Sequence, residues 1–124
     1  MSAEDKLKIL MVDDEINMLE SMGDVLRDEG YLVTTASSGQ EALERLEREN
    51  SECDLLITDL KMPGMNGMEL LSKVHDLYPD IKVIVLTGFG SVDGAVEAMR
   101  NGAWDYILKP FNPDDALSSI RRIK

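Results

Sequence analysis

The 124-residue sequence predicts an α/β fold in which helices cover both faces of a doubly wound parallel sheet. Five short apolar runs alternate with five segments whose apolar residues recur at helical spacing. Residues typical of turns and helix caps separate the two kinds of segment. Strand–helix units repeated in series imply parallel strands that are joined by right-handed crossovers.

The apolar runs are the predicted strands. They are rich in leucine or β-branched residues, and several are continuous rather than alternating, which is typical of strands buried on both faces. The five runs are Leu7–Val12, Tyr31–Thr35, Leu55–Thr58, Ile81–Leu86 and Tyr106–Leu108.

The segments between and after these runs are predicted helices with one apolar face each. The residues predicted to face the core are Leu19, Met22 and Leu26; Leu43 and Leu46; Leu70, Leu71, Val74 and Leu77; Val92, Ala95, Val96 and Met99; and Ala116, Leu117, Ile120 and Ile123. Two helix starts, Ser38 with Glu41 and Asn66 with Glu69, have the spacing of a capping box. Serine and asparagine are preferred at helix starts and glycine at helix ends, so further predicted caps are Ser91 and Asn112 at starts and Gly30 and Gly102 at ends.

Composition narrows the functional class. With 24 acidic and 13 basic residues the net charge is −11, which argues against direct binding of nucleic acid or of an anionic membrane. No apolar run approaches the roughly 20 residues of a membrane span, and the first residues do not resemble a signal peptide. The single cysteine, Cys53, excludes an intrachain disulfide. We therefore expect a cytoplasmic protein with one domain over residues 1–124.

Candidate reactive side chains follow four of the five predicted strands, whereas the second strand ends in Ala36, Ser37 and Ser38, with no charge. In an open parallel sheet, reactive groups gather beyond the carboxyl ends of the strands. The residues expected at that edge are Asp13, Asp14, Glu15, Asp59, Thr87 and Lys109. Carboxylate oxygens at a solvent-open site suit Mg²⁺, and a carboxylate beside such a metal can attack phosphorus and form an acyl phosphate. Acidic residues at strand ends are also common as solvated loop residues, but this explanation is weaker for the whole set than for one residue.

The sequence resembles the receiver domains of two-component response regulators over nearly its whole length, from about Lys8 to Ile123. The matching segments are Met11-Val12-Asp13-Asp14-Glu15, Thr58-Asp59-Leu60-Lys61-Met62-Pro63-Gly64, Thr87-Gly88 and Tyr106-Ile107-Leu108-Lys109-Pro110-Phe111. The segments around Thr87-Gly88-Phe89-Gly90-Ser91 and Gly102-Ala103-Trp104-Asp105-Tyr106 resemble the nitrogen-regulation branch of that family. The resemblance implies a flavodoxin-like (βα)5 fold with strand order 2-1-3-4-5.

The resemblance also implies a role for each matching residue. Asp59 would accept the phosphoryl group. Asp14 would bind Mg²⁺ directly, Asp13 would bind it largely through water, and the backbone carbonyl of Lys61 would be a further ligand.

Three more residues would act on the phosphorylated state. Lys109 would contact the phosphoryl oxygens, and Thr87 would move in to hydrogen-bond the phosphoryl group. Tyr106 would follow Thr87 from an outward to an inward rotamer.

In such a domain the phosphoryl group comes from the phosphohistidine of a sensor histidine kinase, and phosphorylation changes an output surface. The domain catalyses its own phosphorylation and dephosphorylation but turns over no separate metabolite. Members of the nitrogen-regulation branch often join the receiver to an ATPase and a DNA-binding domain. We therefore expect an effector domain beyond residue 124 in a longer chain, regulation of transcription, and a homodimer on phosphorylation.

Two other functions remain open from the residues. A phosphatase of the haloacid-dehalogenase type also uses a strand-end aspartate and Mg²⁺, but its nucleophile follows the first strand in an Asp-x-Asp pattern, where this chain has Asp13-Asp14-Glu15. A flavodoxin-like cofactor binder needs a phosphate-binding loop at the same place, and three acids there would repel phosphate.

Overall fold

The computed structural model describes residues 7–48, 53–60, 64–87, 92–108 and 113–123. Five parallel strands form one sheet in the order β2-β1-β3-β4-β5, which confirms the predicted fold class and strand order. The strands are β1 (Lys8–Val12), β2 (Leu32–Ala36), β3 (Leu55–Thr58), β4 (Lys82–Thr87) and β5 (Asp105–Leu108). Each lies within two residues of its predicted bounds.

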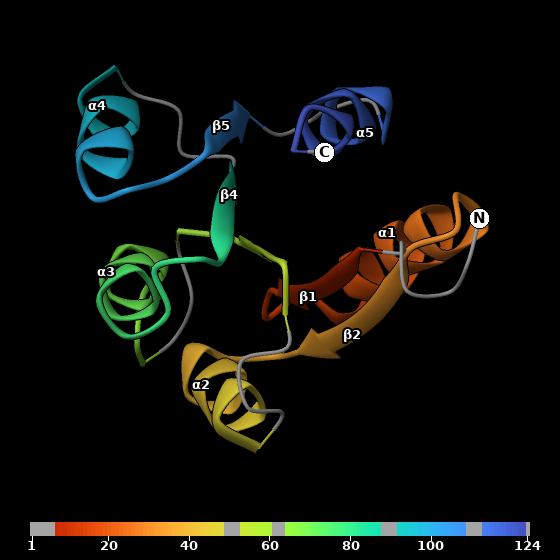
Figure 1. The fold of residues 1–124 in the computed structure, drawn as a ribbon, viewed down its shortest axis with the longest axis horizontal. Helices are drawn as coiled ribbons and strands as arrows, with labels where there is room; N and C mark the ends of the chain where they lie inside the picture. Colours follow the sequence, from red (N-terminus) through yellow and green to blue (C-terminus); the bar gives the residue numbers. More distant parts are fainter. Residues whose placement is uncertain (1–6, 49–52, 61–63, 88–91, 109–112, 124) are drawn as a thin grey trace.

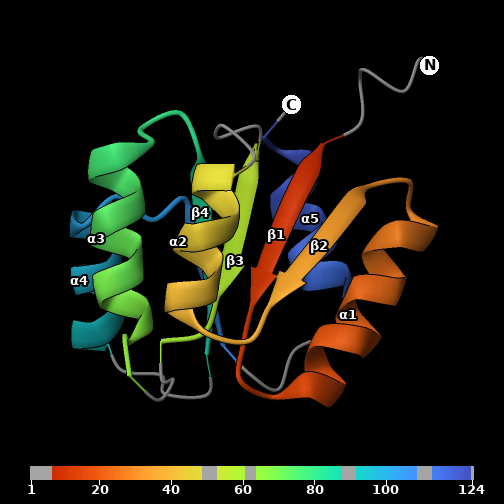
Figure 2. The ribbon, with the colours of Figure 1, turned by 90° about the horizontal axis from the view of Figure 1, so that it is seen from below.

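Helices cover both faces of the sheet. They are α1 (Ile16–Asp28), α2 (Gly39–Arg48), α3 (Gly67–Leu77), α4 (Val92–Arg100) and α5 (Pro113–Arg121). Figure 1 shows α1 and α5 on one face and α2, α3 and α4 on the other. Seen from below, the arrowheads of β1, β2 and β3 point to one edge, where α1 and α3 begin (Figure 2). Among the described helices, none is both long and apolar enough to cross a membrane.

The sheet is buried on both sides, which explains the continuous apolar runs. Leu55 and Ile57 of β3 pack toward α1 and α5, whereas Leu56 between them packs toward α2 and α3. Each of the three has an exposed fraction of 1% or less. Alternate side chains of a strand point to opposite faces, so a strand covered on both faces needs apolar residues at every position.

The two predicted capping boxes differ in the structure. At α3 the box is complete, because Asn66 Oδ1 accepts the backbone N–H of Glu69 at 2.9 Å and Glu69 Oε1 accepts that of Asn66 at 3.3 Å. At α2, Ser38 Oγ accepts the N–H of Glu41 at 3.1 Å as predicted. Glu41, however, reaches one residue further back and accepts the N–H of Ser37 at 2.8 Å. Gly30 and Gly102 have positive φ angles after α1 and α4, as expected at helix ends, whereas Ser91 and Asn112 lie outside the described residues.

The bonds to Glu41 predict a stability difference that depends on pH. The backbone N–H of Ser37 and then its hydroxyl hold the pKa of Glu41 below its ordinary value of 4.5. A carboxyl whose pKa is lowered by folding stabilises the fold above its unfolded pKa, and this contribution is lost as pH falls through the folded pKa. Because Glu41 is partly exposed, we expect Glu41→Gln to lower the free energy of unfolding at pH 6 by only about 0.5 kcal/mol.

Urea unfolding at pH 6 and at pH 3 measures this difference, and it should shrink at the lower pH. Glu44→Gln, three residues further along the same helix at an exposed position, is the control and should change stability little at either pH. An equal loss in Glu41→Gln at both pH values would contradict the prediction.

The predicted core faces of α3 and α4 are partly wrong. Leu77 is 63% exposed at the end of α3, and Val96 and Met99 of α4 are 42% and 49% exposed. Over residues 94–100 of α4, where the burial of side chains is described, the buried residue is Ala98 instead. The sequence pattern of α4 has the spacing of a core face, but over residues 94–100 the neighbouring elements fully bury only the small side chain of Ala98.

Candidate functional site

The register of β1 and β3 places two of the predicted site residues side by side. Val12 is paired with Thr58, so Asp13 and Asp59 directly follow a matched pair. The N–H of Asp59 donates to the carbonyl of Val12 at 3.3 Å, and that of Asp13 donates to the carbonyl of Ala36 at 3.2 Å. Adjacent strands lie about 5 Å apart, so these two residues share one end of the sheet and point to the same face.

The acidic residues at this edge differ in exposure. Asp13 is 1% exposed and Asp59 is 9% exposed, whereas Asp14 is exposed. One oxygen of Asp13, Oδ1, accepts the backbone N–H of Glu15 at 3.0 Å and so shapes the turn that leads into α1. Two buried carboxylates on neighbouring strands repel one another unless cationic groups or hydrogen bonds compensate.

The donor set at this edge fits Mg²⁺. In the described part of the chain, no three His, Cys, Asp or Glu side chains form a group able to hold a metal ion by themselves. Mg²⁺ does not require such a group, because it keeps several waters and commonly binds one or two carboxylates. Asp13, Asp59 and the exposed Asp14 supply hard oxygen donors of this kind at a solvent-open edge.

Two predicted switch residues come from the next strands of the sheet. Thr87 is the last residue of β4 and is paired with Leu108 of β5, while Tyr106 of β5 is paired with Val85. Because Thr58 is paired with Val85, Thr87 lies at the same end of the sheet as Asp59. Tyr106 is partly buried and packs against the apolar cluster on the side of α2 and α3.

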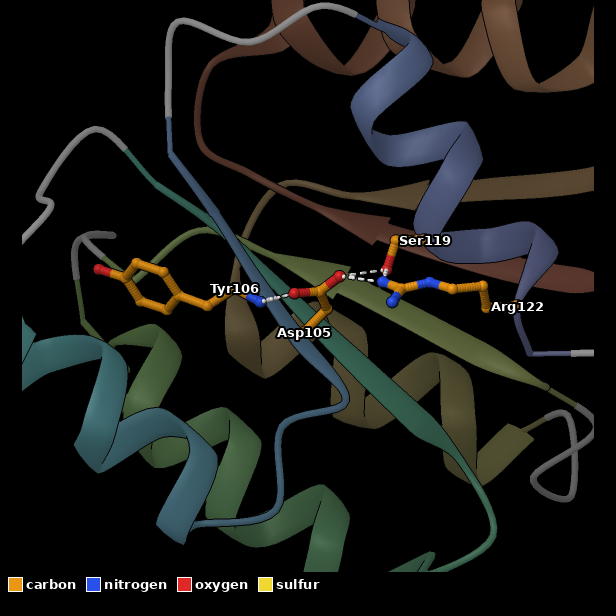
Figure 3. Close-up of polar contacts among 4 residues, drawn as sticks. All are labelled: Asp105, Tyr106, Ser119 and Arg122. Atoms are coloured by element: carbon orange, nitrogen blue, oxygen red, sulfur yellow. Dashed lines mark hydrogen bonds and ion pairs between the residues drawn. The ribbon is translucent and has the colours of Figure 1, made fainter.

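Figure 3 shows how the backbone beside Tyr106 is held. The carboxylate of Asp105 accepts the N–H of Tyr106 at 2.7 Å with Oδ1, and Oδ2 accepts from Ser119 at 2.6 Å and from Arg122 at 2.8 Å. The ring of Tyr106 and the carboxylate of Asp105 extend to opposite sides of β5. This arrangement ties the start of β5 to α5. Lys61 and Lys109, the remaining predicted site residues, lie outside the described residues.

Two residues beside Asp59 were not predicted from the sequence. Thr58 is fully buried, and its hydroxyl donates to the carbonyl of Asp59 at 3.0 Å. Gly67, the first residue of α3, donates its N–H to the carbonyl of Leu60 at 2.8 Å. A glycine directly after an N-cap, eight residues beyond Asp59, is the sequence signal that could have indicated Gly67.

Residues 9–121 match the family described as the response regulator receiver domain. The chain belongs to this family. Receiver domains are signalling domains, and the match confirms the resemblance seen in the sequence. It gives no support to a phosphatase of the haloacid-dehalogenase type or to a flavodoxin-like cofactor binder.

Similar proteins agree with this assignment. The chain is 40% identical over 115 residues to the response regulator protein FleR of Pseudomonas aeruginosa, which covers 93% of this chain and 24% of FleR. The receiver domain is therefore similar to about a quarter of the length of that relative. A receiver domain from Clostridium thermocellum superposes with a TM-score of 0.89 at 38% identity, covering 94% of this chain and 93% of the other.

A third comparison concerns the chemistry of a relative. A response regulator from Burkholderia pseudomallei has been solved with a phosphorylated aspartic acid, a calcium ion and citrate. It superposes with a TM-score of 0.85 at 31% identity, over 92% of this chain and 66% of that one.

Proposed function

We propose that this receiver domain accepts a phosphoryl group on Asp59 from the phosphohistidine of a sensor histidine kinase. The observation that supports this most strongly is the position of Asp59. It follows the central strand β3, is 9% exposed, and is adjacent to the buried Asp13. A carboxylate oxygen of Asp59 attacks phosphorus, the P–N bond of the phosphohistidine breaks, and its electron pair stays on the imidazole, which takes a proton from solvent.

Asp13, Asp14, Asp59 and the backbone carbonyl of Lys61 would hold Mg²⁺ in this function. When bound, the metal neutralises negative charge on the transferring phosphoryl group. The chain's own contribution is to hold the acceptor in place. The β1–β3 pairing fixes the backbone of Asp59, and the Thr58 hydroxyl holds its carbonyl.

Three further residues would act after transfer. Lys109 pairs with the phosphoryl oxygens, and Thr87 hydrogen-bonds the phosphoryl group. Tyr106 responds to Thr87 by changing rotamer, which alters the surface formed by α4 and β5. Thr87 ends β4, one strand from Asp59, and Tyr106 lies within β5, two strands from Asp59; these positions support the two roles.

The domain then acts as a reversible switch. Its own residues also support hydrolysis of the acyl phosphate, in which water attacks phosphorus and the Asp59 carboxylate leaves. Curated relatives such as FleR are about four times longer than the matched region. Because similar proteins of this length include the transcriptional regulatory protein GlrR of Escherichia coli, we infer that the switch controls an effector domain for transcription. We also propose that phosphorylation promotes pairing of two receiver domains.

Intact-mass spectrometry after incubation with acetyl phosphate and Mg²⁺ tests the proposal. We expect one added phosphoryl group on the wild-type chain and none on Asp59→Asn. Asp54→Asn is the matched control, because Asp54 directly precedes β3 and is exposed at its opposite end. Phosphorylation of Asp59→Asn to the wild-type extent would contradict the assignment of the acceptor.

A further inference from the structure

Gly67 lies directly against the backbone of Asp59. It is the first residue of α3 and is buried, and its N–H donates to the Leu60 carbonyl at 2.8 Å. A Cβ added to Gly67 would overlap the carbonyl oxygen of Asp59. It would also lie 2.7 Å from the Cα of Leu60 and 2.8 Å from the carbonyl carbon of Asp59.

All three of these neighbours are backbone atoms, so none can turn aside as the end of a side chain can. Real Cβ atoms are essentially never found closer than 3.0 Å to such a neighbour. A side chain at position 67 therefore requires either α3 or the Asp59–Leu60 backbone to move.

Both sides of this contact are held by other interactions. The capping box of Asn66 and Glu69 fixes the first turn of α3, and three fully buried side chains of that helix, Leu70, Leu71 and Val74, pack toward the sheet. On the other side, Asp59 has a backbone bond to Val12 and accepts from the Thr58 hydroxyl. A shift of the start of α3 would therefore displace Asp59, the residue that follows β3.

We infer that Gly67 is a positioning residue for the proposed phosphoacceptor: its lack of a side chain lets the start of α3 set where the Asp59 carboxylate stands. This inference rests on the proposed function of Asp59. Displacement of a reacting group by about 1 Å can reduce a reaction rate about 100-fold. We therefore expect Gly67→Ala to reduce the rate of phosphorylation at saturating donor and Mg²⁺ at least tenfold.

The chain offers a matched control in Gly39. It is the first residue of α2 and directly follows the cap residue Ser38, as Gly67 follows Asn66. The three heavy atoms nearest to a Cβ added to Gly39 all belong to the side chain of Met65, with Sδ at 3.0 Å and Cβ and Cγ at 3.2 Å. Gly39→Ala should leave the phosphorylation rate within about twofold of wild type.

A second control separates position from stability. Val74→Ala removes buried volume from the same helix about two turns beyond Gly67, so it destabilises the fold by another route. Its phosphorylation rate, divided by the folded fraction from urea unfolding, should stay within about twofold of wild type. If Gly67 served only the stability of the fold, the rate of Gly67→Ala per folded molecule would also stay within about twofold of wild type.

The experiment measures initial rates of phosphoryl incorporation by intact-mass spectrometry on the 124-residue chain, with acetyl phosphate as donor. A rate per folded molecule at least tenfold lower in Gly67→Ala, with both controls near wild type, supports the inference. A near-wild-type rate in Gly67→Ala, or an equal loss in Val74→Ala, overturns it. If Gly67→Ala is unfolded, the comparison is repeated in trimethylamine N-oxide, which favours the folded state.

In the osmolyte, a refolded but slow Gly67→Ala variant supports the inference. A refolded and fast variant overturns it, and so does failure to refold, since Gly67 would then serve the fold rather than the acceptor. The wild-type chain and Asp59→Asn are measured in parallel. If the wild type is phosphorylated and Asp59→Asn is not, the proposed function stands whatever Gly67→Ala does.

Discussion

Mg²⁺ is expected to stabilise the folded domain, and Asp14→Asn is expected to remove most of that stabilisation. Asp13 and Asp59 are buried at the ends of adjacent strands and Asp14 is exposed beside them, so a divalent cation bound there would gain carboxylate oxygen ligands that only the folded state brings together. A ligand that binds only the folded state at ten times its Kd adds about 1.4 kcal/mol to the free energy of unfolding. For a domain of this size the Tm should rise by roughly 5 °C.

Thermal melts with and without millimolar Mg²⁺ measure the effect. Na⁺ at matched ionic strength is needed as a control, because a chain with a net charge of −11 is also stabilised by general screening. Glu15→Gln is the matched variant, since Glu15 is the adjacent exposed acid and is not a proposed ligand. An equal Mg²⁺-dependent rise in wild type and Asp14→Asn would exclude Asp14 as a ligand.

The sequence predicted the parts of this fold that depend on local patterns. The continuous apolar run Leu55–Thr58 indicated a strand buried on both faces, and β3 is that strand. Asn66 with Glu69 indicated a capping box, which the structure contains. These features are set by a few neighbouring residues and by the spacing of apolar residues along the sequence, so they can be predicted without a three-dimensional structure.

The predicted core face of α4 was partly wrong, because the burial of a helix residue depends on the element that packs against it. Val96 and Met99 have core-face spacing in α4 but are exposed, and Ala98 is the buried residue within the described range 94–100. The helix lies toward the edge of the sheet, beyond β4, where less of the sheet is available to cover it (Figure 1). Periodicity shows which residues share a face but not how much of that face a neighbour covers.

The site was partly predictable for a similar reason. Placing Asp13, Asp59 and Thr87 at one end of the sheet required only the strand order and the ends of the runs. The contact of Gly67 with the Asp59 backbone could be predicted only from the position of α3 relative to β3. The role of a glycine depends on the atoms that a side chain in its place would meet, and the sequence does not show them. The hydroxyl of Thr58 is a similar case, since its bond to the next residue's carbonyl depends on a rotamer.

Leu71→Ala is expected to lower the free energy of unfolding by about 3 kcal/mol, whereas Leu77→Ala should lower it by less than about 0.5 kcal/mol. Both residues belong to α3, and the sequence pattern assigned both to its core face. Leu71 is fully buried in the same apolar cluster as Leu10 and Leu56, but Leu77 is 63% exposed at the end of the helix. Deleting the buried side chain removes transfer free energy and leaves a cavity, whereas deleting the exposed one does neither.

Urea unfolding of the two variants tests this directly, since each makes the same chemical change in the same helix. Alanine and leucine have similar helix propensities, so the difference between the variants reports burial rather than helix formation. The free energy of unfolding of a domain is typically about 5–15 kcal/mol, so the loss in Leu71→Ala should shift the urea midpoint strongly. The dependence of that free energy on urea concentration should stay unchanged. Similar losses in the two variants would mean that the end of α3 is covered as well as its middle, contrary to the exposure of Leu77.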